Sequence, residues 1–136
     1  MFELYIKPAF CNTDALGHIS NTVIPEWFES ARDPVFKLFS PDLDPKSWKL
    51  ILAKYEITFH AEIFYGADVL VKTGISHLGN SSFHVKQQVW QNNRMAAEGT
   101  TIMVHFNHDT KKSSPIPELI KNKLSEHLYI TDPESS

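Results

Sequence analysis

The sequence is poor in the features that define several large protein classes. Its 136 residues include one cysteine, Cys11, and five glycines. A single cysteine cannot form an internal disulfide, which favours a reducing, cytoplasmic setting. No apolar run is long enough to span a bilayer, and the N-terminus lacks a signal-peptide pattern. These features argue against a disulfide-stabilised secreted domain and against a membrane protein.

The chain also has no excess of positive charge. Its formal net charge is −3, and its only basic pair, Lys111–Lys112, is explained by a solvated loop. We therefore expect no nucleic-acid partner and no anionic membrane surface. Hydrophobic residues make up 42% of the chain and charged residues 21%, which is the profile of a folded protein. The length predicts a single domain over residues 1–136.

The most informative stretch is residues 10–39, where a polar loop leads into an apolar helix. We expect Asn21 or Thr22 to cap this helix and Pro25 to lie in its first turn. A buried helix whose N-terminus meets a polar loop offers free N–H groups to an anion or a developing oxyanion. Apolar residues recur at the spacing of one helical face: Ile24, Trp27, Phe28, Ala31, Val35, Leu38 and Phe39.

Alternating apolar and polar side chains predict a sheet after this helix. Asn92–Asn93 is a two-residue hairpin signal, because asparagine tolerates positive φ, and Gly99 suggests a bulge. The longest alternation places one apolar set on a single face: Ile51, Ala53, Tyr55, Ile57, Phe59, Ala61 and Ile63. The expected strands are residues 3–10, 51–63, 69–75, 82–91 and 94–106.

The expected helices lie before and after these strands. Pro34 predicts a helix over about residues 23–33 and a break before residues 35–39. Residues 117–128 read as a short amphipathic helix, and residues 131–136 as a frayed tail. This order predicts an α+β protein whose antiparallel sheet wraps around the aromatic helix. One helix cannot cover both faces of the sheet, so we expect a partner subunit at a sheet edge or face.

The polar loop and the helix resemble those of a known family. Residues Thr13 to Asn21 read TDALGHISN, and Trp27 to Glu29 and Ala31 to Arg32 follow at a fixed spacing. They are similar to the T-D-x-x-G-H-x-N-N loop and the Y-F-E-x-A-R helix of hotdog-fold acyl-CoA thioesterases of the 4-hydroxybenzoyl-CoA thioesterase-like group. Residues 78–83, LGNSSF, are similar to the family's G-x-S-S-F strand start. The resemblance covers residues 3–106.

The resemblance implies a curved antiparallel sheet around a long central helix, in a homodimer whose two sheets join edge to edge. It also implies hydrolysis of an acyl-CoA at the dimer interface, without a metal or redox cofactor, and it leaves a dimer of dimers open. By the same resemblance Asp14 is the catalytic carboxylate, and N–H groups at the start of the helix polarise the thioester carbonyl. Ser20, Ile24 and Pro25 depart from the family pattern, so the activity that the resemblance implies needs an experimental test.

Asp14 and His18 are the candidate catalytic residues. A carboxylate can attack a thioester or activate water, although aspartate also forms Asx turns. His18 either contacts the thioester or stabilises the loop through a backbone hydrogen bond. The candidate oxyanion donors are the N–H groups of Asn21, Thr22 and Val23, which also fit an ordinary helix cap. The candidate substrate-binding hydroxyls are those of Ser81 and Ser82, which fit either a contact with the pantetheine arm or the start of a hairpin.

Two other sets of residues are weaker candidates. Nothing in the sequence activates the thiol of Cys11, and His105 and His108 lack a third metal ligand. The departures from the family pattern motivate a rival function, a non-catalytic protein that binds acyl-CoA or an acyl carrier. A hotdog dehydratase or hydratase is disfavoured, because no Asn-Pro element lies between Asp14 and His18.

Overall fold

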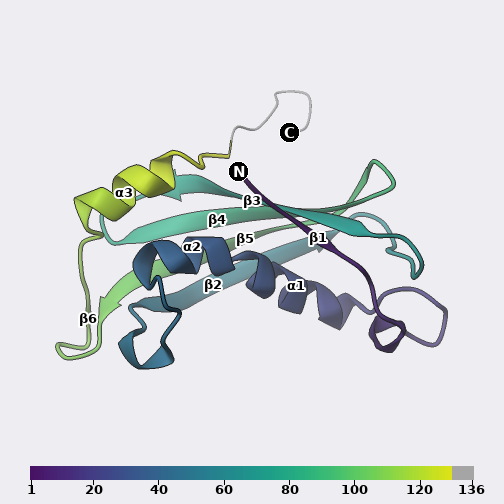
Figure 1. Ribbon diagram of the computed structural model, residues 1–136, viewed down its shortest axis with the longest axis horizontal. Coiled ribbons are helices and arrows are strands. Elements are labelled where there is room, and N and C mark those ends of the chain that lie inside the picture. Colours follow the sequence, from purple (N-terminus) through teal and green to yellow (C-terminus); the bar gives the residue numbers. More distant parts are fainter. Residues whose placement is uncertain (130–136) are drawn as a thin grey trace.

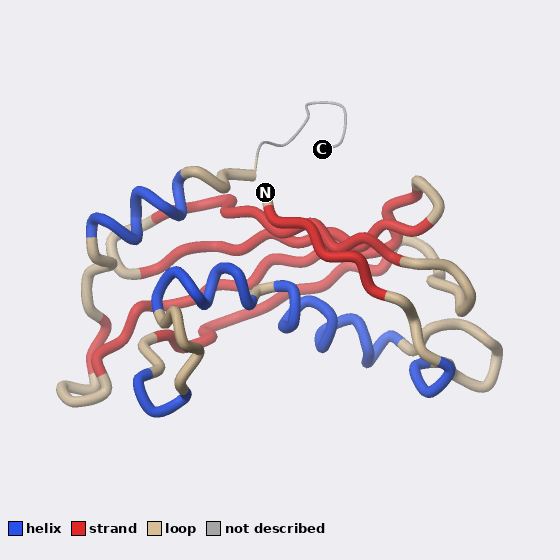
Figure 2. The backbone as a smooth tube through the Cα atoms, viewed as in Figure 1, coloured by secondary structure: helices blue, strands red, loops and turns tan. Residues whose placement is uncertain are grey.

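A computed structural model describes residues 1–129, except for the side chain of Ser47. The chain forms a curved antiparallel sheet against the helices of its N-terminal half (Figures 1 and 2), which confirms the expected α+β hotdog arrangement. The strands are β1 (Phe2–Ile6), β2 (Leu50–Phe59), β3 (Val69–Leu78), β4 (Ser82–Gln91), β5 (Arg94–Asn107) and β6 (Lys112–Ser113). The helices are α1 (Ile24–Ala31), α2 (Asp33–Phe39) and α3 (Glu118–Ser125), with 3-10 turns at Phe10–Asn12, Asn21–Val23 and Pro45–Ser47.

The sheet has the strand order β1-β3-β4-β5-β2, and β6 pairs with the end of β5. The Asn92–Asn93 turn between β4 and β5 is confirmed, with both residues at positive φ. Beside β1, the C-terminal segment continues the edge, because the Ile75 N–H donates to the His127 carbonyl at 2.8 Å and the Tyr129 N–H donates to the Ile75 carbonyl at 2.6 Å. No strand within residues 1–129 pairs with the outer edge of β2.

A proline produces the break between α1 and α2. Pro34 has no N–H to donate to the carbonyl of Ser30, four residues earlier, so the helical ladder is interrupted there. Arg32 occupies the junction and serves as the C-cap of α1. The predicted break is confirmed, although the α-helix begins at Ile24 because Asn21–Val23 form a separate 3-10 turn.

Side chains from the sheet satisfy carbonyls at the end of α1. Gln87 Nε2 donates to the Phe28 carbonyl at 2.8 Å, and Thr73 Oγ1 donates to the Ala31 carbonyl at 3.4 Å. Gln87 is buried, and its Oε1 accepts a hydrogen bond from Arg32 Nη1 at 3.2 Å. A buried carbonyl left without a donor costs about 1–3 kcal/mol, so these bonds hold the helix junction against β3 and β4.

The core has two halves, one under each helix of the pair. The apolar face of α1 packs on β3, β4 and β5, whereas α2 packs on other parts of the same strands and on Leu124 of α3. The predicted helix face is confirmed, except that Leu38 is half-buried and Phe36 is buried in addition. The buried residues of the two helices are Ile24, Trp27, Phe28, Ala31, Val35, Phe36 and Phe39.

Strand β2 differs from the strict alternation that the sequence predicted. Its register against β5 shifts between Leu52 and Lys54, as it does at a β-bulge. A bulge changes which residues of the strand share a face, so Leu50 is buried while Ile51 of the predicted apolar face is 38% exposed. The strand lies at the edge of the sheet, and most of its residues are exposed in the single chain.

Several elements are shorter than expected. The first strand ends at Ile6, before Pro8, and β2 ends at Phe59 rather than at residue 63. The last helix ends at Ser125 instead of reaching residue 128. The expected frayed tail, residues 131–136, lies outside the described residues.

Gly99 is a close-packing position, and the predicted bulge there is wrong. Gly99 pairs in continuous register with Ile57 on β2 and with Gln87 on β4. A Cβ atom at this position would lie 2.9 Å from the Glu56 carbonyl oxygen and 3.0 Å from Phe28 Cε2. Glycine therefore allows the Phe28 ring to approach the sheet.

We expect Gly99→Val to destabilise the protein by about 1–3 kcal/mol, because the added atoms overpack the contact with Phe28. The free energy of unfolding in urea measures this effect. The matched control is Thr100→Val, a partly exposed neighbour on the opposite face of β5, for which a change within about 0.5 kcal/mol is expected. Equal unfolding midpoints for wild type and Gly99→Val would show that the contact is not tight.

Candidate active site

A cavity of about 550 Å³ lies where the N-terminal polar loop meets the end of β2. The loop contributes Asp14, His18 and Asn21, three of the residues predicted from sequence, and α1 contributes Ile24. The opposite wall is formed by residues 59–63. The structure therefore brings the two candidate catalytic residues and the start of the helical segment to one cavity.

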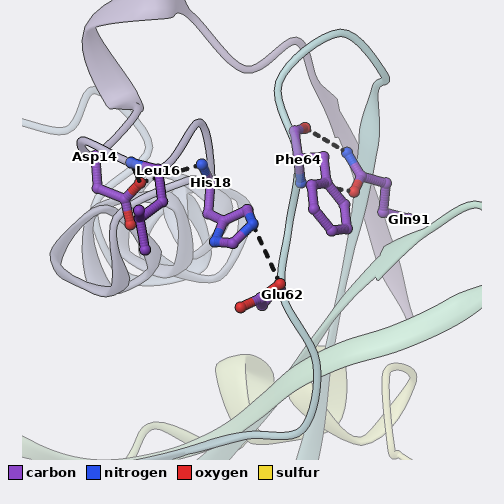
Figure 3. A network of polar contacts seen from close by, with 6 residues as sticks. All are labelled: Asp14, Leu16, His18, Glu62, Phe64 and Gln91. Atoms are coloured by element: carbon purple, nitrogen blue, oxygen red, sulfur yellow. Dashed lines mark hydrogen bonds and ion pairs between the residues drawn. The ribbon is translucent and has the colours of Figure 1, made fainter.

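Backbone hydrogen bonds orient the carboxylate of Asp14. Its Oδ1 accepts from the Leu16 N–H at 2.8 Å and from the His18 N–H at 3.1 Å (Figure 3). The Asp14 N–H donates to the His18 carbonyl at 2.8 Å, and Gly17 makes the turn with a φ of 81°. Within residues 1–129, Oδ2 has no hydrogen-bond partner. Asp14 thus forms the Asx-type turn and still presents one free carboxylate oxygen.

His18 faces Glu62 of the opposite wall and Phe64, which follows that wall in the chain (Figure 3). Its Nε2 is 3.3 Å from Oε2 of Glu62, and its ring packs edge-on against Phe64 with the ring centroids 5.1 Å apart. Sequence reasoning did not single out Glu62, because no motif links positions so far apart. Its only signal was its place on the polar face of the predicted strand.

Gln91 fixes this wall to the sheet. It is buried at the end of β4, and its Oε1 accepts from the Phe64 N–H at 3.0 Å. Its Nε2 donates to the carbonyls of Phe64 at 2.8 Å and of Ala67 at 3.0 Å (Figure 3 shows the Phe64 contacts). The segment that carries Glu62 is therefore held by three hydrogen bonds from one side chain.

The start of the helical segment leaves one free donor at the cavity. Ser20 is its cap, and this corrects the expectation that Asn21 or Thr22 would be. The Val23 N–H donates to the Ser20 carbonyl at 3.0 Å, and the Thr22 N–H faces Ser20 Oγ at 3.4 Å. The Asn21 N–H has no acceptor within residues 1–129, and Asn21 lines the cavity whereas Thr22 and Val23 do not. Asn21 is therefore the remaining candidate oxyanion donor of the three.

Ser81 and Ser82 lie at the other end of the sheet from Asp14. Strand β4 begins at Ser82 and ends at Gln91, which contacts the wall of the cavity. The Ser81 carbonyl accepts from the His105 N–H at 2.7 Å. A single chain therefore does not bring these two serines to the candidate site.

The weaker candidates have structural places of their own. Cys11 is exposed in a 3-10 turn rather than at a strand end. His105 Nδ1 is hydrogen-bonded to Ser114 Oγ at 2.8 Å, so its ring is part of a strand-end contact. Residues 1–129 contain no group of three metal-ligating side chains placed to hold an ion. No helix in that range is long and apolar enough to cross a membrane.

Comparisons with known proteins agree with this fold and loop. The sequence model of the thioesterase-like superfamily matches residues 9–124. The chain is 40% identical to a predicted thioesterase from Bacillus stearothermophilus, with a TM-score of 0.93 over 96% of this chain and 98% of that one. A thioesterase from Thermus thermophilus, complexed with coenzyme A and Zn, is 28% identical, with a TM-score of 0.80 over 90% of this chain and 95% of that one.

No curated protein matches the chain. The superfamily match nevertheless includes the Asp14 loop, both helices of the central pair and the four long strands from β2 to β5. The length of this match, and the agreement of the fold with the similar structures, decide the family to which the chain is assigned. The chain belongs to the thioesterase-like superfamily and has the hotdog fold.

Proposed function

We propose that the protein is an acyl-CoA thioesterase, which converts an acyl-CoA and water into a free acid and coenzyme A. The superfamily and the thioesterase relatives support thioester hydrolysis in general. The observation that carries the proposal is that one cavity is lined both by Asp14, whose Oδ2 has no hydrogen-bond partner in the described range, and by Asn21, whose N–H has none there. Release of thiol from a panel of acyl-CoA substrates tests it.

In this mechanism Asp14 acts as the general base. Its Oδ2 accepts a proton from a water molecule as that water attacks the thioester carbonyl carbon. The Asn21 N–H stabilises the negative charge that develops on the carbonyl oxygen, a contribution worth roughly a hundredfold or more in rate. The tetrahedral intermediate collapses with cleavage of the C–S bond, and the proton held by Asp14 passes to the departing sulfur of coenzyme A.

A second copy of the chain completes the site in this proposal. The free edge of β2 exposes large side chains, with Leu52 42% and Tyr55 54% exposed. Antiparallel pairing of two β2 edges about a two-fold axis places the Leu50 end of one strand beside the Phe59 end of the other. The Ser81–Ser82 turn of the partner subunit then approaches the cavity from its own end of the sheet. Its hydroxyls would contact the pantetheine arm.

Glu62 has a positioning role in this proposal, since it contacts His18 and not the thioester. The two side chains are 26% and 63% exposed, and such exposed pairs contribute about 0.2–1 kcal/mol. We therefore expect Glu62→Gln to lower kcat/KM by at most about fivefold. Steady-state kinetics, with Glu118→Gln on the exposed face of α3 as the control, measure this. A loss of a hundredfold would mean that Glu62 itself is the base.

A further inference from the structure

The seam where the helices α1 and α2 face strand β2 contains one buried cation, Arg32. We propose that Arg32 recognises an oxygen near the far end of the acyl group, so that the preferred substrate is a medium-chain acyl thioester bearing a terminal hydroxyl or keto oxygen. The proposal rests on the acyl-CoA function argued above and specifies its substrate class.

Three cavities follow one another along this seam. The 550 Å³ active-site cavity ends at Ile24 and Phe59, and the next, of about 270 Å³, begins beside them at Pro25 and Ile57. A third, of about 620 Å³, continues between α2 and the start of β2. Arg32 lines both the second and the third cavity. The seam therefore runs from Asp14 past Arg32, and Figure 1 shows α2 and α1 following one another across the face of the sheet that contains β2.

Apolar side chains line one part of the path from the active site to Arg32. The side chains of Ile24 and Phe59 lie at its start, and those of Phe28, Tyr55 and Ile57 follow in the second cavity. A hydrocarbon chain buries its surface favourably against such side chains. The seam therefore suits the carbon chain of an acyl group as far as Arg32.

Arg32 has unused hydrogen-bonding capacity at this point. It is only 5% exposed, and its Nη1 donates to Gln87 Oε1 at 3.2 Å and to Thr101 Oγ1 at 3.3 Å. Its Nε is buried without a partner, and neither Nε nor Nη2 bonds to any residue in the range 1–129. Burial lowers the pKa of the guanidinium, and the nearby Glu29 carboxylate opposes this shift. Because Nε has almost no accessible surface, a ligand in the cavities would reach Arg32 through Nη2, which can donate to an oxygen of the ligand.

The surrounding charges favour a neutral oxygen over a carboxylate. Glu26, Glu29 and Glu56 line the second cavity together with Arg32. Within residues 1–129 none of the three forms an ion pair with Arg32, and Glu56 is paired with Lys54 at 2.7 Å. Three carboxylates around the cavity repel a further negative charge, whereas a hydroxyl or keto oxygen accepts a hydrogen bond from the guanidinium without that repulsion.

Two measures bracket the length of the acyl group. From the Asn21 donor to Arg32 the chain advances eleven residues, roughly 16 Å at about 1.5 Å per helical residue. Along the sheet, Thr101, which accepts from Arg32, pairs with Tyr55, four residues before Phe59, which is roughly 13 Å at about 3.3 Å per residue. Allowing about 3 Å for the hydrogen bond leaves about 10–13 Å. An extended chain with bonds of about 1.5 Å covers this distance with roughly eight to ten carbons.

The test uses equilibrium binding of thioether analogues of coenzyme A, which cannot be hydrolysed. Three octyl analogues carry a terminal hydroxyl, a terminal carboxylate or no oxygen, and isothermal calorimetry gives their Kd values for the wild type. We expect the hydroxyl analogue to bind roughly tenfold more tightly than the plain one, and the carboxylate analogue to gain less. In Arg32→Met the advantage of the hydroxyl is lost, while Lys37→Met, an exposed cation of α2, retains it.

A second variant covers the case in which Arg32→Met does not fold. Thr101→Val removes one hydrogen bond to the guanidinium with almost no change of shape, and it should reduce the hydroxyl advantage. Equal Kd values for the hydroxyl and plain analogues in the wild type would overturn the proposal. A hydroxyl preference that survives both variants would also overturn the proposal. An Arg32→Met protein whose only change is dissociation into monomers would overturn it as well, because a carboxylate of the partner subunit would then be the ligand of Arg32.

The binding readout separates this inference from the proposed hydrolysis. A protein that prefers the hydroxyl analogue but releases no thiol from any acyl-CoA would retain the Arg32 site and lose the catalytic proposal. A protein that hydrolyses acyl-CoA substrates without the binding preference would retain the catalytic proposal and lose the role of Arg32.

Discussion

Asp14→Asn should lower the turnover number by roughly a hundred- to ten-thousand-fold, the range for losing a positioned base. The amide oxygen of asparagine can still accept the N–H groups of Leu16 and His18, which hold the turn in the native protein. The second oxygen, which is free to activate water, is replaced by an NH2 group that cannot accept a proton. Chemistry is lost in this variant while the loop is retained.

Three measurements on the same protein distinguish these effects: turnover, affinity for a thioether analogue of the substrate, and melting temperature. We expect only turnover to change strongly, since the Asn21 N–H and the walls of the cavity are untouched. Asp68→Asn, an exposed carboxylate near the start of β3, is the matched control and should behave as wild type. A folded Asp14→Asn protein with near-wild-type turnover would remove Asp14 from the mechanism.

The double substitution Leu52→Glu and Tyr55→Glu should convert the proposed dimer into a monomer and lower the proposed hydrolysis by about a hundredfold. Both side chains are exposed on the free edge strand β2, so the single chain should still fold. In a two-fold dimer centred on this stretch, the new carboxylates of one copy lie near those of the other, and these like charges repel. The site then loses the Ser81–Ser82 turn of the partner subunit, and both charges also enter the wall of the second cavity. Misplacement of substrate by about 1 Å can cost a hundredfold.

Sedimentation velocity and thiol release, measured on the same samples, test this expectation. Tyr5→Glu changes the opposite edge, β1, where Tyr5 is 68% exposed, and it should leave both assembly and activity intact. A wild-type protein that is monomeric at micromolar concentration and fully active would contradict the proposed dimer. An active double variant that remains dimeric would place the interface elsewhere.

Local features of the fold were predictable because short-range chemistry determines them. The three- and four-residue spacing identified the buried face of the helix pair, and Pro34 identified the break within it. Asn92–Asn93 identified a hairpin because two consecutive residues there need positive φ. Asp14 and His18 stood in one loop motif, so their proximity followed from the sequence.

Features that depend on distant contacts were not predictable. Glu62 meets His18 because Gln91 holds this wall to the end of β4 and because the Ile19 N–H donates to the Ile63 carbonyl at 2.7 Å. No glycine or proline marks the bulge between Leu52 and Lys54 in the sequence, and this bulge makes the buried face of β2 differ from the predicted one. Gly99 looked like a bulge residue, but it is a packing position whose partner, the Phe28 ring, is remote in sequence.

The central claim is that this protein hydrolyses acyl-CoA thioesters at the Asp14 cavity. The most direct measurement is the initial rate of free thiol release from acyl-CoA substrates of increasing chain length, with the free acid quantified in the same reaction. The account predicts saturable release by the wild type, one acid per thiol, and loss of that release in Asp14→Asn. Binding of the analogues with no release above the spontaneous rate, for any chain length, would contradict it and identify a binding protein instead.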